Sequence, residues 1–361
     1  MAAGESLSSW LRLTLIPGIG GETQRKLLSA FGLPQAIFSA GYSALRGVVG
    51  SKAASLLLDT DNQALVAQAC AWSEGERQHL VTLADPEYPQ ALLEIPDPPT
   101  LLYVRGRVDL LNRLSLAIVG SRNPTPQGVH NAEHFAASLV DAGLLIISGL
   151  ALGIDAAAHR GALAASGETV ALIGTGIDRI YPARNRDLAL AIGDQGSIIS
   201  EFPIGTPVTG ANFPRRNRLI SGMSRGVLVV EAATESGSLI TARLAGEQGR
   251  EVLAIPGSIH SPQSRGCHQL IKQGAKLVES AQDVLEELRL NIPLKTVPPS
   301  NDNSAPSQLL AMMGFDPCGI DELGARTGLT ADALSVMLLH LELDGRIASL
   351  PGNLYQQLPA A

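Results

Sequence analysis

Four arginines stand close together in the stretch ANFPRRNRLISGMSRG, which spans residues 211–226. The chain as a whole has 361 residues and a formal net charge of −7, and no Asp or Glu lies between Glu201 and Glu231. Guanidinium groups bind phosphates through geometrically defined, charge-assisted hydrogen bonds. Phe213 precedes the arginines, and its ring can either stack on a base or pack in the core. The cluster predicts a local phosphate-binding patch on an otherwise acidic protein.

Glycine-rich and serine-rich turns follow several apolar runs of the chain. VGSRNPTPQG (residues 119–128) and SGLALGID (148–155) each come after such a run, and ESGSL (235–239) opens a helical pattern. Glycines let a backbone approach a ligand closely, and the N–H groups that open a helix favour an anion. The carboxyl ends of parallel strands meet at one edge of a sheet. We therefore expect these turns to lie beside the arginines.

Other features of the sequence argue against several classes of protein. No GxGxxG or GK[ST] phosphate loop occurs, so we expect no nucleotide cofactor. The three cysteines are far apart and form no CxxC, and His130 and His134 lack a third partner, so we expect no metal. No apolar run approaches the roughly 20 residues of a membrane span, and the first residues lack a secretory pattern. We expect a cytoplasmic protein that does not enter the membrane.

The apolar pattern predicts the elements that position these residues. Between residues 108 and 290, short β-branched runs alternate with helical patterns, which indicates an α/β domain with a doubly wound, mainly parallel sheet. Residues 1–80 read as helical. Within them LIPGIGGETQRKLLSAFG (15–32) is typical either of a helix-hairpin-helix that meets a phosphate or of a plain turn between packed helices. The plain turn is favoured, because the motif occurs once with few basic neighbours. The predicted strands are LSLAIVGS, LLIISG, TVALIGTG, SIISEFP, GVLVVEA, EVLAIPG and AKLVES.

Two proline-rich segments separate the remaining parts. Residues 81–107 are predicted to connect the helical domain to the sheet domain, and residues 291–307 have the composition of a linker. Residues 308–361 follow the order of a winged helix, but they carry two arginines against six acids. The segment in the position of a DNA-reading helix contains Asp332 and no lysine or arginine. This domain is therefore interpreted as a protein-docking or structural module.

Six motifs in order resemble the bacterial DNA processing protein A family, also called DprA or Smf. They are GSRNPT, SGLALGID, IYPARN, NFPRRNRLISGMS, SGSLITARLAGEQGREVLAIPG and GCHQLIKQGAKLV. The resemblance implies a Rossmann-like domain that binds single-stranded DNA without sequence preference and forms a homodimer. It also implies loading of the RecA recombinase onto incoming DNA in natural transformation, an N-terminal helical domain similar to a sterile alpha motif or helix-hairpin-helix, and a C-terminal winged helix.

The same resemblance implies the residues of a positively charged pocket at the strand ends. Arg225 is left out, because it opens the next predicted strand and is expected to be structural. The expected DNA-binding residues are Gly120, Ser121, Arg122, Ser148, Gly149, Gly153, Asp155, Phe213, Arg215, Arg216, Asn217, Arg218, Ser236, Gly237 and Ser238.

An enzyme is the alternative, since the fold also resembles nucleotide phosphoribohydrolases. Those enzymes carry a Glu one turn inside the helix that follows a PGGxGT turn. Here the corresponding position is Thr241, and no Glu lies between Ser236 and Gly246. General acid and base catalysis needs a titratable group within reach of the reacting atom. We therefore expect a binding protein with no catalytic residues.

Overall fold

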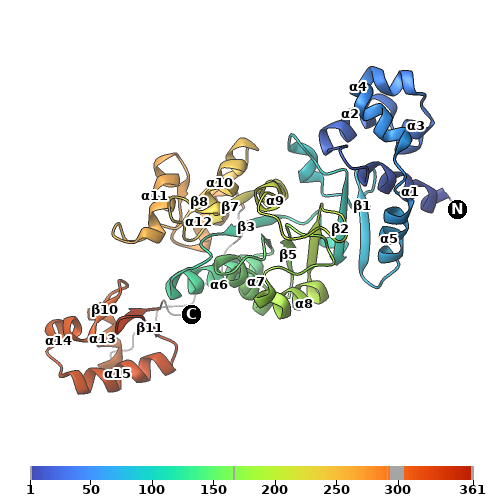
Figure 1. Ribbon diagram of the computed structural model, residues 1–361. Coiled ribbons are helices and arrows are strands. Elements are labelled where there is room, and N and C mark those ends of the chain that lie inside the picture. The colour runs from blue at the N-terminus through green and yellow to red at the C-terminus, as the bar shows by residue number, and fades with distance from the viewer. Residues whose placement is uncertain (1, 166, 291, 293–304, 359–361) are drawn as a thin grey trace.

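A nine-stranded sheet runs through the centre of the computed structural model, which describes residues 2–165, 167–290, 292 and 305–358 (Figure 1). The strands lie in the order β1-β2-β6-β5-β4-β3-β7-β8-β9. From β6 to β9 all neighbours are parallel, whereas β1 and β6 both pair antiparallel with β2. All seven predicted strands are present, as β3 to β9. The bounds are β1 Gln78–Thr82, β2 Leu101–Gly106, β3 Ser115–Val119, β4 Leu145–Ser148, β5 Thr169–Leu172, β6 Ser197–Ser200, β7 Gly226–Val229, β8 Glu251–Ala254 and β9 Lys276–Leu277.

Helices cover both faces of this sheet, which explains why its central strands are continuously apolar. Alternate residues of β3 divide between the two faces: Ala117 and Val119 pack toward α9 and α10, and Leu116 and Ile118 pack toward α6 and α7. The α/β, Rossmann-like fold expected from the sequence is confirmed. The helices of this domain are α6 Pro126–Asp141, α7 Ile154–Ala165, α8 Arg186–Gln195, α9 Asn212–Gly222, α10 Gly237–Glu247, α11 Arg265–Lys272 and α12 Ala281–Glu287.

The sheet begins earlier in the chain than the sequence indicated. β2 falls inside residues 81–107, which were interpreted as a connection, and β1 lies mostly in the predicted helical region. Five prolines between residues 86 and 99 separate the two strands and made the whole segment resemble a linker. The loop between them packs on the sheet domain through Tyr88, whose hydroxyl donates to the Pro99 carbonyl over 2.7 Å.

Helices fill the N-terminal region, as predicted. The second to fourth enclose a small core that includes Leu27, Ile37 and Leu45 and that α1 also enters. The other side of α1 and helix α5 pack toward the sheet, where Trp72 meets Tyr103 edge-on. In the first turns of α2, the Gln24 amide donates to the Ile19 carbonyl in the preceding Pro-Gly turn and accepts from the Thr100 hydroxyl. That bond ties the turn to the sheet domain. The bounds are α1 Ala2–Thr14, α2 Gly21–Phe31, α3 Pro34–Ser39, α4 Tyr42–Asp59 and α5 Gln63–Ser73.

Both ends of the sheet are short or covered. At one end β9 has only Lys276 and Leu277, and the Lys276 ammonium pairs with Glu287 at 3.4 Å. At the other end α5 lies against β1 (Figure 1). Among the described helices, none has both the length and the apolar composition needed to cross a bilayer.

The C-terminal region forms the expected winged helix around a core of its own, which includes Leu323, Leu334 and Leu338. The Gln356 amide donates to the Gln127 side chain on α6 over 3.0 Å. Of the predicted linker 291–307, residues 291 and 293–304 lie outside the described part of the chain. The bounds are α13 Ala305–Met313, β10 Cys318–Gly319, α14 Ile320–Thr327, α15 Ala331–Leu343, β11 Ile347–Leu350 and β12 Leu354–Gln357.

Candidate nucleic-acid interface

A cleft of about 660 Å³ opens at the carboxyl edge of the sheet, and we call it the strand-end cleft. It lies at the ends of β3 and β7, which are neighbours in the sheet. From β3 the chain crosses to β4 on one side, and from β7 it crosses to β8 on the other side. Open α/β sheets bind ligands at such a switch point. Ten of the residues expected from the sequence line it: Gly120, Ser121, Arg122, Asp155, Phe213, Arg216, Asn217, Ser236, Gly237 and Ser238.

A carboxylate occupies the start of the first helix after β3. Glu231, directly beyond β7, accepts hydrogen bonds from the Thr125 N–H at 2.9 Å and the Thr125 hydroxyl at 2.5 Å. A Cβ at Gly128 would lie 2.4 Å from the Glu231 carboxyl carbon, so the glycine leaves room for this contact. Burial raises the pKa of Glu231, and the bonds from Thr125 oppose that shift. In dinucleotide-binding sheets this helix start holds a pyrophosphate, and here the chain supplies the anion itself.

Arg122 and Phe213 line the exposed side of the strand-end cleft, and the ring of Tyr181 lies beside Phe213. The guanidinium carbon of Arg122 lies 5.7 Å from the centroid of the Phe213 ring. The Tyr181 ring lies 5.8 Å from the Phe213 ring at an angle of 38°, and Tyr181 is 44% exposed. A Cβ at Gly174 would come within 3.0 Å of Phe213, so the glycine seats this ring. Sequence reasoning missed Tyr181 as a site residue, although it stands in the IYPARN motif.

The start of α10 forms the opposite rim. The Ser236 hydroxyl oxygen accepts the Ser238 N–H over 3.3 Å and lies 2.7 Å from the Ser238 hydroxyl. The first turn of α10 contains no acidic residue, and Gly237 is exposed. The Asn217 amide reaches the Gly237 carbonyl at 3.5 Å and connects α9 to this rim. The positive end of the α10 dipole therefore faces the cleft, which favours a bound anion.

Arg216 lies beneath the cleft and is only 4% exposed. Its guanidinium donates to the carbonyls of Gly149 and Leu172, which lie at the ends of β4 and β5. Burial lowers the pKa of Arg216 to about 10, while the nearby charge of Asp155 opposes that shift. The Asp155 carboxylate in turn accepts the N–H groups of Gly149 and Ala151, at 3.1 and 3.4 Å. Burial raises the pKa of Asp155, and Arg216 opposes this. Arg216 and Asp155 thus order the floor of the cleft.

Two other expected residues also serve the backbone. The Ser148 side chain is completely buried and donates to the Ile118 carbonyl over 2.6 Å, so its hydroxyl does not face the cleft. Gly153 has φ +81°, and a Cβ there would lie 2.3 Å from the Ser121 carbonyl oxygen. Only glycine fits this close crossing of two turns.

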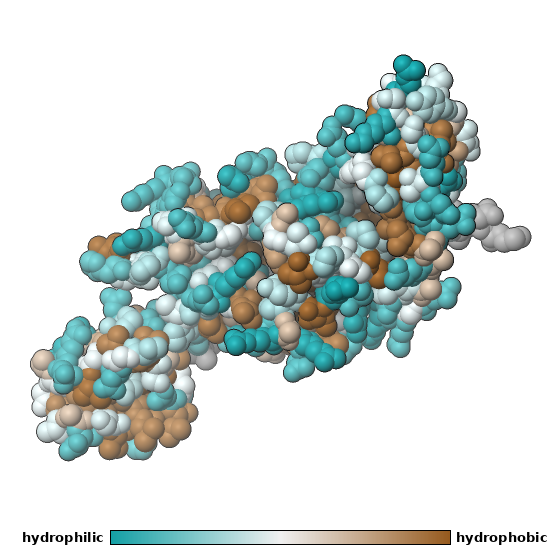
Figure 2. All heavy atoms as spheres, in the orientation of Figure 1, coloured by the Kyte–Doolittle hydropathy of each residue, from teal (hydrophilic) through white to brown (hydrophobic). Residues whose placement is uncertain are grey.

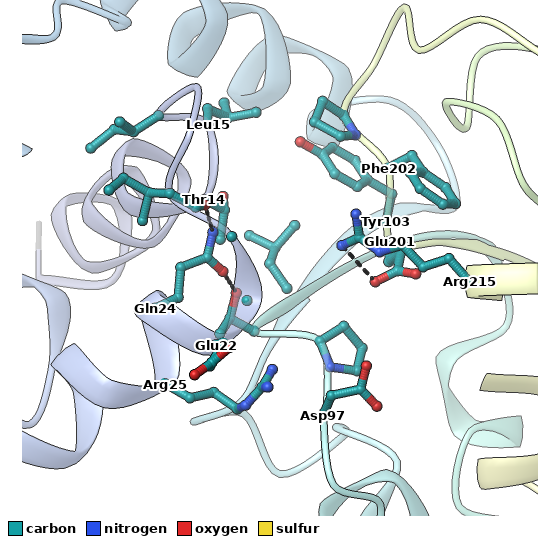
Figure 3. A pocket seen from close by; sticks show the side chains of 18 of the residues that line it. Thr14, Leu15, Glu22, Gln24, Arg25, Asp97, Tyr103, Glu201, Phe202 and Arg215 are labelled. Carbon is teal, nitrogen blue, oxygen red and sulfur yellow. Dashed lines mark hydrogen bonds and ion pairs between the residues drawn. The ribbon is translucent and has the colours of Figure 1, made fainter. Parts of the chain in front are cut away.

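Arg215 and Arg218 face a different cleft, of about 820 Å³, between the α2 turn and the end of β6 (Figure 3). One oxygen of Glu201 meets both arginines, Arg215 at 3.2 Å, and Asp97 lies 2.9 Å from Arg218. Burial raises the pKa of Glu201, and the two arginines oppose that shift. Figure 3 shows Glu201 and Arg215 joined on one side of the cleft, with Arg25 and Glu22 on the other. Acidic and basic side chains are balanced here, which does not suit a polyanion.

The arginine cluster is therefore not a single patch, contrary to the expectation from the sequence. Successive helical residues point about 100° apart, whereas residues three apart share a side, so Arg215 and Arg218 leave α9 on one side and Arg216 leaves it on another. Tertiary contacts bring Glu201 and Asp97 to two of them, although no carboxylate is close in sequence. Arg215 remains 54% exposed at its side chain and is reachable from solvent. Arg225, left out of the site, is exposed, and its N–H donates to the Ser115 carbonyl.

Two family models match the chain. Residues 79–289 match DNA recombination-mediator protein A, and residues 293–353 match the DprA winged helix domain. Protein Smf of Escherichia coli (strain K12) is 42% identical over 298 residues, which cover 80% of this chain and 80% of that protein.

Two solved structures of the same family superpose on this one. DNA processing protein A from Streptococcus pneumoniae has a TM-score of 0.68 at 38% identity, covering 77% of this chain and 95% of that one. DNA processing protein A from Helicobacter pylori, described for its single-stranded DNA binding mode, has a TM-score of 0.54 at 31% identity, covering 60% and 98%. The first family model covers more than half of the chain, and the resemblance read from the six sequence motifs is confirmed. The chain belongs to the DNA recombination-mediator protein A family.

Proposed function

We propose that this recombination mediator binds single-stranded DNA in the strand-end cleft, without preference for sequence. One observation carries the proposal: the exposed guanidinium of Arg122, the ring of Phe213 and the start of α10 line one cleft, and the ring of Tyr181 lies beside Phe213. The Helicobacter pylori relative, described as binding single-stranded DNA, supports it.

Each part of the cleft has a distinct task in this proposal. Arg122 and the N–H groups at the start of α10 hold phosphates, and Asn217 and the Gly120–Ser121 backbone shape the groove between them. Phe213 and Tyr181 stack bases, each stack contributing about 1–3 kcal/mol whatever the base. Asp155, Arg216, Gly149 and Gly153 keep the turns in place beneath the strand. Arg215 adds a flanking contact only when it leaves Glu201, which makes that contact weaker.

A binding role without catalysis fits the titratable groups of the cleft. Asp155 is buried and accepts two backbone N–H groups, and the residue one turn inside α10 is Thr241, which is buried. Glu235 stands exposed on the rim, before α10, and not one turn inside the helix, where the phosphoribohydrolase alternative requires its Glu. Incubation with nucleoside monophosphates tests the phosphoribohydrolase alternative, since release of free base would contradict the non-enzymatic proposal.

RecA loading and a homodimer through the Rossmann-like domain are further parts of the proposal, and both rest on the family resemblance. The test is RecA filament formation on single-stranded DNA already coated with a single-strand-binding protein. Filaments that form no faster with the protein present would remove RecA loading from the proposal, and sedimentation as a monomer at all concentrations would remove the dimer.

The DNA-binding proposal is tested by fluorescence anisotropy with an oligo-dT strand over a range of salt concentrations. Replacing Arg122 by Ala removes one phosphate contact, so the slope of log affinity against log salt becomes shallower by about 0.7. Phe213→Leu and Tyr181→Leu each weaken binding by about 1–3 kcal/mol with little change in slope.

The matched control is Arg243→Ala, which removes an arginine that is 70% exposed on the same domain but outside the cleft. It leaves both affinity and slope as in the wild type. An Arg122→Ala variant whose slope equals that of the control would refute the proposed interface.

A further inference from the structure

The winged-helix domain carries an apolar helix face that no described part of the chain covers. α15 packs its inner side into the domain core through Leu334, Leu338 and Leu341. Its outer side carries Val336, Leu339 and Leu343, which are 57%, 55% and 77% exposed and which we call the outer stripe. Neighbouring large apolar side chains that stay exposed on one helix face are typical of an interaction site. The outer stripe therefore has the composition of a contact surface.

The three residues of the outer stripe form one continuous row. Their spacing of three and four residues places them on the same face of the helix. The row extends over about 10 Å, from the rise of about 1.5 Å per residue. Figure 2 shows hydrophobic spheres gathered along the side of the C-terminal domain on which α15 runs in Figure 1. This length matches the anchors of two to three turns of a partner helix.

One acidic residue stands near each end of the outer stripe, and His340 lies beside it, one turn after Val336. Asp332 lies one turn before Val336 on the same face, and Asp344 follows Leu343; both are exposed. Residues 308–361 hold six acids and two arginines, and one of these, Arg326, already pairs with Glu322 at 2.5 Å. The stripe is thus an apolar row within a negative field.

This charge decides between the possible occupants. Nucleic acid and an anionic membrane would be repelled by the acids around the stripe. A second copy of the chain would bring the same acids against each other, because a two-fold contact repeats the same patch on both sides. A helix with an apolar face flanked by Lys and Arg satisfies both the stripe and its rim.

We propose that the outer stripe of α15 binds a basic amphipathic helix of a partner protein. The surface is separate from the strand-end cleft and shares no residue with it. Partner and DNA are therefore bound at the same time, and the proposal does not depend on the DNA-binding proposal.

The test measures binding of the full chain to two synthetic peptides about five turns long. One carries a Leu face flanked by Lys, and the other carries the same Leu face flanked by Glu. Fluorescence anisotropy is expected to show binding of the Leu/Lys peptide and at least about tenfold weaker binding of the Leu/Glu peptide. Equal binding of the two peptides would overturn the charge argument.

Substitutions then locate the contact. Val336→Asn/Leu339→Asn/Leu343→Asn weakens the Leu/Lys peptide at least about tenfold, because the apolar anchors are gone. The matched control Leu33→Asn/Leu58→Asn/Leu93→Asn changes three exposed apolar residues elsewhere and leaves binding as in the wild type. Asp332→Asn/Asp344→Asn lowers affinity and flattens its dependence on salt.

Three outcomes would overturn the proposal. Equal loss in the outer-stripe variant and in its control would show unspecific adsorption. The stripe would be assigned to a second copy by another combination of results: the wild-type chain does not bind the Leu/Lys peptide and sediments as a dimer, and the outer-stripe variant sediments as a monomer. Third, an unchanged salt dependence in Asp332→Asn/Asp344→Asn, which leaves the core untouched, would contradict the charge argument even if the apolar variant unfolds. Circular dichroism checks the folding of each variant.

Discussion

Replacing Arg216 by Met distinguishes a structural arginine from one that contacts DNA. Arg216 is 4% exposed, its guanidinium donates to the carbonyls of Gly149 and Leu172, and its charge favours the ionised form of the buried Asp155 carboxyl. Methionine fills much of the volume but leaves both carbonyls and the carboxylate without a partner. A hydrogen bond to a charged group contributes about 1.5–3 kcal/mol, and removing one partner of a buried charged group costs about 3–5 kcal/mol.

These two figures describe the same guanidinium, so they overlap and do not add. The free energy of unfolding is expected to fall by about 3–5 kcal/mol. For a domain of this size each kcal/mol lowers the melting temperature by about 2–4 °C, which gives a decrease of about 6–20 °C. Arg215→Met is the matched control: its side chain is 54% exposed, and the loss of its ion pair with Glu201 costs below about 1 kcal/mol.

The assay compares thermal and urea unfolding of both variants with their single-stranded DNA affinity. We expect Arg216→Met to lose stability first and affinity only as a consequence, so that affinity returns at low temperature where the variant is folded. An Arg216→Met chain with a wild-type melting temperature and a collapsed DNA affinity would refute the reasoning, because the guanidinium would then contact DNA directly.

Three further predictions address the cleft turns, the buried imidazole and the C-terminal domain. Gly153→Ala destabilises the domain by at least about 1–3 kcal/mol in urea unfolding, because the alanine must adopt φ +81° and its Cβ would lie 2.3 Å from the Ser121 carbonyl oxygen. The control Gly237→Ala, which has open space around it, leaves the free energy of unfolding unchanged. Burial lowers the pKa of His159 to about 3 from its ordinary 6.5, so stability present above pH 6.5 is lost as the pH falls toward 3. From about pH 7 to about pH 5 the wild type loses about 2 kcal/mol relative to His159→Asn, and parallel pH profiles would contradict this assignment. Removal of residues 308–361 leaves single-stranded DNA affinity within about twofold in anisotropy, because that acidic domain contributes no phosphate contact; a collapse in a chain that still unfolds cooperatively would contradict it.

Most of the sheet could be predicted because its central strands are buried on both faces. Runs such as LSLAIVGS are apolar without interruption and end in glycine or serine, which leaves few alternatives to a parallel strand. β1 and β2 were missed for a physical reason. QHLVT is short and mixed in polarity, and the prolines between the two strands dominate the composition of the segment that joins them.

The candidate site was predictable at its turns and less so at its helix. Arg122, Phe213 and Ser236 lie at strand or helix ends, where the topology alone brings them together. The direction in which each arginine of α9 points depends on the rotation of that helix against the sheet. The ion pair between Glu201 and Arg218, which are 17 residues apart, could not be predicted from their separation in sequence. Tyr181 approaches Phe213 only through the path of the β5–α8 loop, which no local pattern encodes.

The short and covered ends of the sheet constrain how copies of this chain can assemble. β9 offers two residues, one of them an ion-paired lysine, and α5 lies against β1. At the two described ends of the nine-stranded sheet, a neighbouring molecule therefore finds no long unpaired strand to extend, which disfavours edge-to-edge aggregation there. The proposed dimer would therefore be built from helix and loop surfaces, so variants designed to separate its subunits belong on those surfaces and not on the sheet edges.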